Sequence, residues 1–212
     1  MTDTVLKLRR RARWMLNRQG WQRRSSRLPR DPQGKLMLHV GCGDVDAPGY
    51  INIDARPMPH VHFVIDDLRD IDFVPPASVD LVYMCHVLEH VRHPEVGSVL
   101  RAAHSILRPG GTLRLAVPDF DLILDIYGRT NREMDSILGV MMGNQDYPQN
   151  AHYTAFNAAS LEHRMQSSGF KDVRPWEADR VEHHAFSDTS NSPYSYLGRD
   201  YPISLNLEAT RP

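Results

Sequence analysis

The sequence has few cysteines and no long apolar run. Two cysteines, Cys42 and Cys85, occur in 212 residues. They are too few and too far apart for a disulfide framework or a zinc site, so we predict a reduced, cytoplasmic protein. No apolar run approaches the roughly 20 residues of a membrane span. Arginines interrupt the apolar stretches near the N-terminus, so we expect no secretory signal. With 41% hydrophobic and 24% charged residues, the composition excludes wholesale disorder.

Net charge is also nearly absent, at −1 for the whole chain. That value hides an asymmetry. Residues 1–35 carry eleven Lys or Arg and two Asp, whereas residues 36–212 carry fourteen Lys or Arg and twenty-four Asp or Glu. The length favours one domain or two small ones. We therefore predict a basic N-terminal arm over residues 1–35 and one domain over residues 36–212, with Pro29, Pro32 and Gly34 marking the boundary.

The arm has the pattern of a basic amphipathic helix. A narrow apolar stripe on its helical wheel consists of Val5, Leu8, Ala12, Met15 and Leu16. A helix of this kind can lie on an anionic membrane surface. It can equally bind RNA, a partner, or the acidic body of its own protein. The alternative is a solvated, partly disordered tail.

From Leu36 onward, short apolar runs alternate with helical periodicity. The pattern predicts strands at residues 36–40, 50–53, 61–65, 79–84, 112–117, 170–174 and 203–209. It predicts helices at residues 94–107, 120–143 and 158–168. This alternation predicts a doubly wound, mostly parallel α/β sheet. The polar stretch 176–202 is long for a loop, and we expect it to be either functional or mobile.

Glycine or polar residues stand at the carboxyl ends of five predicted strands. They are Gly41-Cys42-Gly43, Asp54, Asp66-Asp67, Cys85-His86 and Pro118-Asp119. Ligands of open α/β sheets bind at this edge. Since the strands themselves are apolar, the five ends together predict a ligand site.

The first of these ends is not a dinucleotide fingerprint. In G-x-G-x-x-G the third glycine allows close packing near a pyrophosphate, but here that position is Asp46, and Asp44 adds a second carboxylate. Two carboxylates would repel a pyrophosphate. They suit a ligand that is cationic at this point, as S-adenosylmethionine is, and they disfavour NAD.

Several segments together resemble the class I S-adenosylmethionine-dependent methyltransferases. They are residues 38–43, Asp54, residues 66–68, 78–83, 86–90 and 107–112. A closer likeness is to predicted methyltransferases of bacterial surface-polysaccharide gene clusters, through the G-Y-I-N-I-D segment Gly49–Asp54 and through His152 before the late helix. The resemblance implies a Rossmann-like sheet with S-adenosylmethionine as cofactor. A crossover helix needs about a dozen residues, so the first crossovers must be shortened or replaced by loops.

The resemblance also assigns cofactor contacts. The turn Gly41-Cys42-Gly43 would approach the methionine part, and Asp54 would accept hydrogen bonds from the ribose hydroxyls. Asp67, with Leu68 beside it, would meet the adenine, and Asp66 could exchange roles with Asp67. His86 would lie near the sulfonium. We expect the Cys42 and Cys85 side chains to be small buried groups.

For the chemistry, we expect O-methylation of a sugar or glycan. His86, Glu89 and His90 are spaced i, i+3 and i+4, so they share one face of a helix or tight turn. One histidine could accept the acceptor proton while Glu89 orients it; alternatively, Glu89 and His90 only brace the turn.

Five further residues complete the sequence hypothesis. We expect His152 and Tyr153 to be lid residues over the acceptor, with His152 as another candidate base or else a structural histidine. Asp119 would bind acceptor hydroxyls. His183-His184 lacks metal-ligand spacing, and we predict no metal site.

The acceptor itself stays open between a small molecule and a lipid-linked glycan. For the second, the basic arm would dock on the inner face of the cytoplasmic membrane. One alternative is an RNA methyltransferase of the same fold. The sequence disfavours it, because it has Met84-Cys85 where pyrimidine-carbon methylation uses Pro-Cys, and it has no Asn/Asp-Pro-Pro-aromatic motif. Another alternative is a cofactor-binding partner subunit without catalysis.

Overall fold

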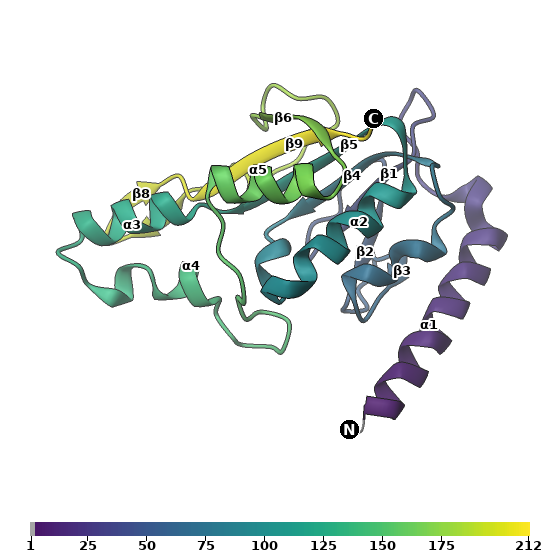
Figure 1. The fold of residues 1–212 in the computed structure, drawn as a ribbon, viewed down its shortest axis with the longest axis horizontal. Coiled ribbons are helices and arrows are strands. Elements are labelled where there is room, and N and C mark those ends of the chain that lie inside the picture. Colours follow the sequence, from purple (N-terminus) through teal and green to yellow (C-terminus); the bar gives the residue numbers. More distant parts are fainter. Residues whose placement is uncertain (1–2) are drawn as a thin grey trace.

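A computed structural model describes residues 3–212 (Figure 1). Its centre is a seven-stranded sheet in the order β3-β2-β1-β4-β5-β9-β6. The strands are β1 (Met37–Val40), β2 (Tyr50–Asp54), β3 (Phe63–Val64), β4 (Val79–Cys85), β5 (Leu107–Pro118), β6 (Lys171–Pro175) and β9 (Ser204–Thr210). Strands β1 to β5 run parallel, and β9 lies antiparallel to both β5 and β6. The mostly parallel α/β fold and each predicted strand are confirmed.

Helices flank this sheet. The α-helices are α1 (Asp3–Arg24), α2 (Val96–Ile106), α3 (Phe120–Arg129), α4 (Leu138–Met142) and α5 (Ala158–Ser167). Short 3-10 turns are η1 (Ser25–Arg27), η2 (Leu68–Phe73), η3 (Leu88–His90), η4 (His93–Glu95) and η5 (Met134–Ser136). Within residues 3–212, no helix combines the length and apolar character of a membrane span.

The two faces of the sheet are covered differently. Side chains alternate along each strand, so Leu38 and Val40 on β1 join the core under α2 and α5, whereas His39 points to the opposite face. There Trp176 and Phe186, from the coil after β6, pack on Tyr50 and Tyr83. The polar stretch 176–202 therefore supplies part of the core in place of a helix. It continues into a hairpin of β7 (Tyr194–Tyr196) and β8 (Arg199–Tyr201).

The first crossovers contain no helix, as predicted. Residues 41–49 connect β1 to β2, and residues 55–62 connect β2 to β3, in turns and coil. The chain bends directly after β1, where the N–H groups of Gly41 and Cys42 both donate to the Ile53 carbonyl, at 2.7 and 3.2 Å. The turn after β1 is thereby fixed against the end of β2.

The single helix predicted over residues 120–143 is wrong. Helices α3 and α4 are separate, because Asn131 and Arg132 adopt left-handed backbone angles, with φ of 54° and 62°, that no α-helix continues through. Ile126 and Ile137 are buried between the two helices and the hairpin that follows. With the β7–β8 hairpin these helices form a lobe beyond the carboxyl end of β5 (Figure 1).

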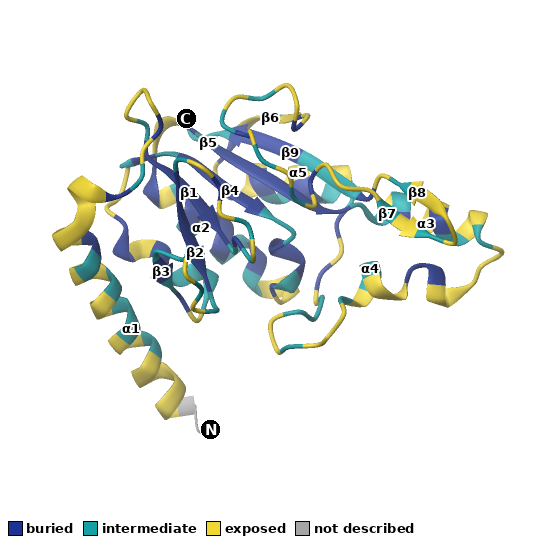
Figure 2. Cartoon of the chain, turned by 180° about the vertical axis from the view of Figure 1, so that it is seen from behind, coloured by how far each residue is buried: buried dark blue, intermediate teal, exposed yellow. Residues whose placement is uncertain are grey.

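Helix α1 packs along β3 and η2 through its basic and aromatic face. Arg10 donates to both Asp70 oxygens at 2.6 and 2.9 Å, and Trp21, 6% exposed, packs on Phe63 and Phe73. The predicted apolar stripe points the other way, since Val5, Leu8, Met15 and Leu16 are all exposed. Figure 2 shows much of α1 in the colour of exposed residues. The acidic body thus contacts one face of α1 and leaves the apolar face open.

Candidate functional site

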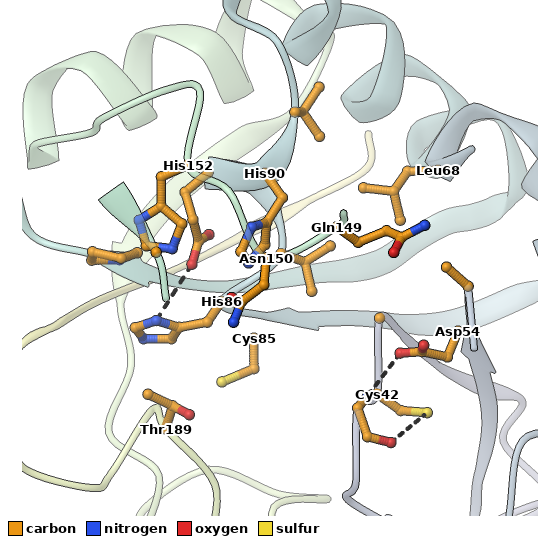
Figure 3. Close-up of a pocket in the computed structure, with 18 of the residues that line it drawn as sticks. Cys42, Asp54, Leu68, Cys85, His86, His90, Gln149, Asn150, His152 and Thr189 are labelled. Atoms are coloured by element: carbon orange, nitrogen blue, oxygen red, sulfur yellow. Dashed lines mark hydrogen bonds and ion pairs between the residues drawn. The ribbon is translucent and has the colours of Figure 1, made fainter. Parts of the chain in front are cut away.

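The strand ends open into one cavity of about 830 Å³, within the usual range for small-molecule sites. Four of the five predicted strand-end groups line it, and at the fifth only Pro118 does. Figure 3 shows Cys42, Asp54 and Leu68 on one side of the view and the three histidines on the other. We call these the glycine end (Gly41, Cys42, Gly43, Asp54, Leu68) and the histidine end (His86, Glu89, His90, His152).

At the glycine end two glycines leave the backbone without side chains, because both have positive φ angles and at Gly41 a side chain would also lack room. Gly41 has a φ of +71°, and a Cβ there would lie 2.4 Å from Val87 Cγ2. Gly43 has a φ of +54°, and its N–H donates to Asp54 Oδ2 at 2.8 Å. The sequence motif therefore produces a fixed turn whose backbone a ligand can approach closely.

Asp54 lies at the end of β2, and its carboxylate can accept further hydrogen bonds. It is only 8% exposed, and its Oδ1 accepts the Arg56 N–H at 2.8 Å. Each carboxylate oxygen thus has one backbone donor, and each can accept a second hydrogen bond. The carboxylate is oriented in advance for a ligand with two neighbouring donors.

Asp67 differs, because the chain itself supplies its donors. Its Oδ1 accepts Arg69 N and Nε, and its Oδ2 contacts Arg69 Nη2 and, at 3.0 Å, Arg10 Nη1. Burial would raise the pKa of Asp67, but these arginines outweigh burial and lower it. Neighbouring Asp66 pairs with Arg13 at 2.9 Å. The carboxylate positions are therefore filled, and Leu68 remains as an apolar part of this wall.

His86 marks the start of the histidine end. Its φ of +50° is unusual for a residue other than glycine. Ser204 Oγ donates its only proton to the Thr189 carbonyl at 2.7 Å. In its contact with His86 Nε2, also at 2.7 Å, the Ser204 hydroxyl is therefore the acceptor and Nε2 carries the proton. This leaves Nδ1 as the unprotonated nitrogen, 3.4 Å from Glu89 Oε1. Burial lowers the pKa of His86 to about 4, so the ring is neutral at pH 7.

Glu89 is 1% exposed, and within the described chain neither of its oxygens has a hydrogen-bond donor. Burial raises its pKa to about 8. Its backbone carbonyl accepts the N–H groups of Tyr153 and Thr154 at 2.8 and 3.1 Å. These bonds bring the distant segment around His152 against η3.

His90 and His152 form a ring pair, with centroids 4.8 Å apart. His90 Nδ1 donates to the Ala151 carbonyl at 3.1 Å, which leaves Nε2 with a lone pair. Burial lowers the pKa of both rings, that of His152 to about 4. The histidine end therefore holds three neutral imidazoles around one buried carboxyl group.

The model of the methyltransferase domain family matches residues 12–174, most of the chain. The chain belongs to this methyltransferase family. The match begins inside α1, which agrees with the packing of that helix on the sheet.

Solved structures share the fold of this methyltransferase at low identity. An S-adenosylmethionine-dependent methyltransferase from Archaeoglobus fulgidus is 14% identical, with 98% of each chain covered and a TM-score of 0.53. The complex of the Haloferax volcanii Trm112 activator with a methyltransferase gives 14% identity, 94% coverage of each chain and a TM-score of 0.53. The 1,6-didemethyltoxoflavin-N1-methyltransferase of Burkholderia thailandensis is 16% identical over 98% of this chain and 88% of its own, with a TM-score of 0.50. No curated protein matches significantly.

Of the residues predicted to contact the acceptor of the methyltransferase, two line the cavity and one does not. His152 and Tyr153 line the cavity, and Tyr153 is 55% exposed. Asp119 does not line it. Its carboxylate instead accepts the Asp121 N–H at 3.0 Å and caps α3. The structure thus gives Asp119 a capping role and leaves it away from the cavity.

Two cavity residues of the methyltransferase lie outside the strand-end pattern. Asp188, from the stretch 176–202, accepts from Tyr83 Oη at 2.6 Å and lines the cavity. Burial would raise its pKa, but hydrogen bonds from His184, Ser190 and Tyr83 outweigh this and lower it. Tyr147 packs under the Arg56 guanidinium, 4.8 Å from ring centroid to Cζ, and closes the glycine end. Neither residue follows a strand, so strand periodicity could not indicate them.

Proposed function

We propose that the chain is an S-adenosylmethionine-dependent O-methyltransferase acting on a hydroxyl of a sugar or glycan. The observation that carries the proposal is the division of one cavity between a glycine end and a histidine end. The first can hold a nucleoside-like cofactor, and the second can accept a proton. Membership of the methyltransferase family supports the same assignment.

The glycine end fits S-adenosylmethionine. The bare backbone of Gly41, Cys42 and Gly43 would accommodate the methionine part, and the two open acceptor positions on Asp54 match a pair of ribose hydroxyls. We assign the adenine contact to Leu68, because Asp66 and Asp67 already hold arginines. Bound there, the cofactor supplies a methyl group activated by its sulfonium.

The histidine end supplies what an alcohol acceptor needs. A hydroxyl becomes a better nucleophile when a neutral imidazole accepts its proton. His86, His90 and His152 are neutral because burial lowers their pKa values. Among them His86 lies nearest the cofactor in the family resemblance, and its Nδ1 carries the lone pair. The surrounding chain excludes water and fixes the approach of the acceptor.

Methyl incorporation tests this function. Purified protein is incubated with methyl-labelled S-adenosylmethionine and, in parallel, with nucleotide sugars, lipid-linked glycans and RNA. We expect label in a sugar or glycan fraction. Label in RNA alone would support the RNA methyltransferase. Calorimetry with S-adenosylmethionine and NAD separates the remaining cases: tight cofactor binding without any product would support a non-catalytic subunit, and binding of NAD alone would overturn the proposal.

For a lipid-linked acceptor, we propose that the exposed apolar face of α1 docks on an anionic membrane. Val5, Leu8 and Leu16 are solvent-exposed, and exposed Arg9 and Arg11 flank them, a combination typical of interfacial helices. Sedimentation with phosphatidylglycerol vesicles should exceed that with phosphatidylcholine vesicles or RNA. Leu8→Glu with Leu16→Glu should abolish it, while Leu124→Glu on α3, which is also an exposed leucine, should not. Sedimentation with RNA but not vesicles would reject the membrane role.

A further inference from the structure

The Glu89 carboxyl group has no partner that accounts for its burial. It is 1% exposed, and neither oxygen has a hydrogen-bond donor among residues 3–212. The nearest basic atom is His86 Nδ1, at 3.4 Å. A buried polar group without a hydrogen-bond partner costs about 1–3 kcal/mol even when it is neutral, and more when it is ionised. A bound ligand that pairs with the group offsets this cost.

Two imidazoles face the same point. One donor atom each from Glu89, His90 and His152 lie within 4.8 Å of one another, and Figure 3 shows the His90 and His152 rings drawn close together. We propose that Glu89, His90 and His152 bind one divalent transition-metal ion through two imidazole nitrogens and one carboxylate oxygen. This donor set suits Zn²⁺, Mn²⁺, Fe²⁺ or Co²⁺.

The cluster is compact enough for side-chain rotation to close it around an ion. Zinc lies about 2.0–2.2 Å from nitrogen and oxygen ligands and holds them tetrahedrally, so two ligands of one ion are about 3.3–3.6 Å apart. The three donor atoms lie within 4.8 Å of one another, so they need to approach by up to about 1.5 Å, which changes of side-chain torsion angles can supply. The hydrogen bonds from Tyr153 and Thr154 to the Glu89 carbonyl already hold the His152 segment in place.

The tautomer of His90 is also set for metal binding. Its Nδ1–H is fixed on the Ala151 carbonyl, so Nε2 has the lone pair. Histidine ligands commonly donate their second ring N–H to a backbone carbonyl in this way. Ala151, which orients the His90 ring, directly precedes His152. The segment that carries one proposed ligand thus orients another, as expected for a preorganised metal site.

Three protein ligands leave coordination positions open, and all three residues line the cavity. An ion there would bind an acceptor hydroxyl oxygen and make it more acidic. His90 and His152 would then act as ligands, and His86 would remain as the base. Metal binding itself does not depend on the proposed function, and its test needs neither cofactor nor acceptor.

The test measures metal directly on the full chain. Chelator-treated protein is titrated calorimetrically with Zn²⁺ and with Mn²⁺, and Co²⁺ binding is followed by its visible absorption. We expect one ion per chain. Glu89→Gln, His90→Ala and His152→Ala should each weaken Zn²⁺ binding by about 100-fold or more, since even loss of an outer-shell partner costs about 10–100-fold. His163→Ala, which removes an exposed histidine of α5, should leave it unchanged.

Folding is checked on the same samples by circular dichroism. Glu89→Gln conserves shape, and His152 is a partly buried residue outside the helices and strands, so these two variants provide folded comparisons. A wild-type chain that binds none of the three ions would overturn the proposal. So would folded Glu89→Gln and His152→Ala variants that bind Zn²⁺ as tightly as wild type.

Discussion

The two ends of the cavity satisfy their carboxyl groups in opposite ways. At the glycine end, Asp54 accepts backbone N–H groups from Gly43 and Arg56. At the histidine end, Glu89 is more deeply buried, yet within the described chain no donor reaches its oxygens. Asp54 is thus held by the fold whether or not a ligand is bound, whereas Glu89 lacks the partner that its burial requires.

This contrast indicates that the two ends have different roles, one in binding and the other in reactivity. Preorganised donors and acceptors cost nothing to arrange when a ligand arrives, so they favour binding. Groups left without partners are costly in the free protein and gain most from a bound cation or substrate. We therefore expect substitutions at the glycine end to change affinity for the cofactor, and those at the histidine end to change turnover.

The largest effect should come from His86→Asn. Asparagine tolerates the left-handed backbone at this position but cannot act as a base. General-base catalysis contributes about 10²–10⁴-fold, so kcat should fall by that order while the dissociation constant of S-adenosylmethionine stays near wild type. Turnover and calorimetry measure the two quantities. A fall in cofactor affinity with unchanged kcat would show that His86 binds the cofactor and is not the base.

Gly41→Ala should damage the glycine end most. The added Cβ would meet Val87 at 2.4 Å, and the φ of +71° strains any side chain. Overpacking costs about 1–3 kcal/mol, and left-handed backbone about 1–2 kcal/mol more. Gly110→Ala is the matched control, because it has a φ of +78° but nothing within 4 Å. Chemical denaturation should show the larger loss for Gly41→Ala; equal losses would mean that Val87 moves away freely.

Asp54→Asn should weaken cofactor binding by about 10- to 100-fold, the value of charge-assisted hydrogen bonds worth about 1.5–3 kcal/mol. Turnover at saturating cofactor should change less. Asp80→Asn provides the control. Asp80, on β4, also accepts a backbone hydrogen bond, from the N–H of Leu36 at 2.7 Å, but it lies outside the main cavity. If both variants bind cofactor equally well, Asp54 only braces the turn.

The sequence pattern was sufficient for features that local periodicity encodes. Apolar runs located the strands, and parallel strands must end at one edge, so Gly41, Asp54 and His86 were correctly placed around one cavity. The pattern failed where a partner comes from a distant segment. Nothing local to Asp67 indicates that Arg10 reaches it from α1, and nothing local to Asp119 distinguishes a cap from a ligand-binding group.

The same reason explains the histidine end. The i, i+3, i+4 spacing groups His86, Glu89 and His90, but the lack of a donor for Glu89 among residues 3–212 depends on all the segments packed around it. The family resemblance points to His152, while its place beside Glu89 comes from backbone hydrogen bonds across η3. Asp188 reaches the cavity from a polar stretch in which neither periodicity nor a strand end gives any signal.

The smallest effect should follow from Arg10→Ala. Arg69 contacts both Asp67 oxygens by itself, so removing Arg10 should leave the wall beside Leu68 in place. The Arg10 side chain is one-third exposed, and such ion pairs contribute about 0.2–1 kcal/mol. We expect a stability loss in that range, with cofactor affinity changed by no more than about 5-fold. Arg11→Ala, on the outer side of α1, is the control. A much larger loss of affinity for Arg10→Ala alone would show that α1 completes the glycine end, because Asp67 would then depend on a cation that the domain body does not supply.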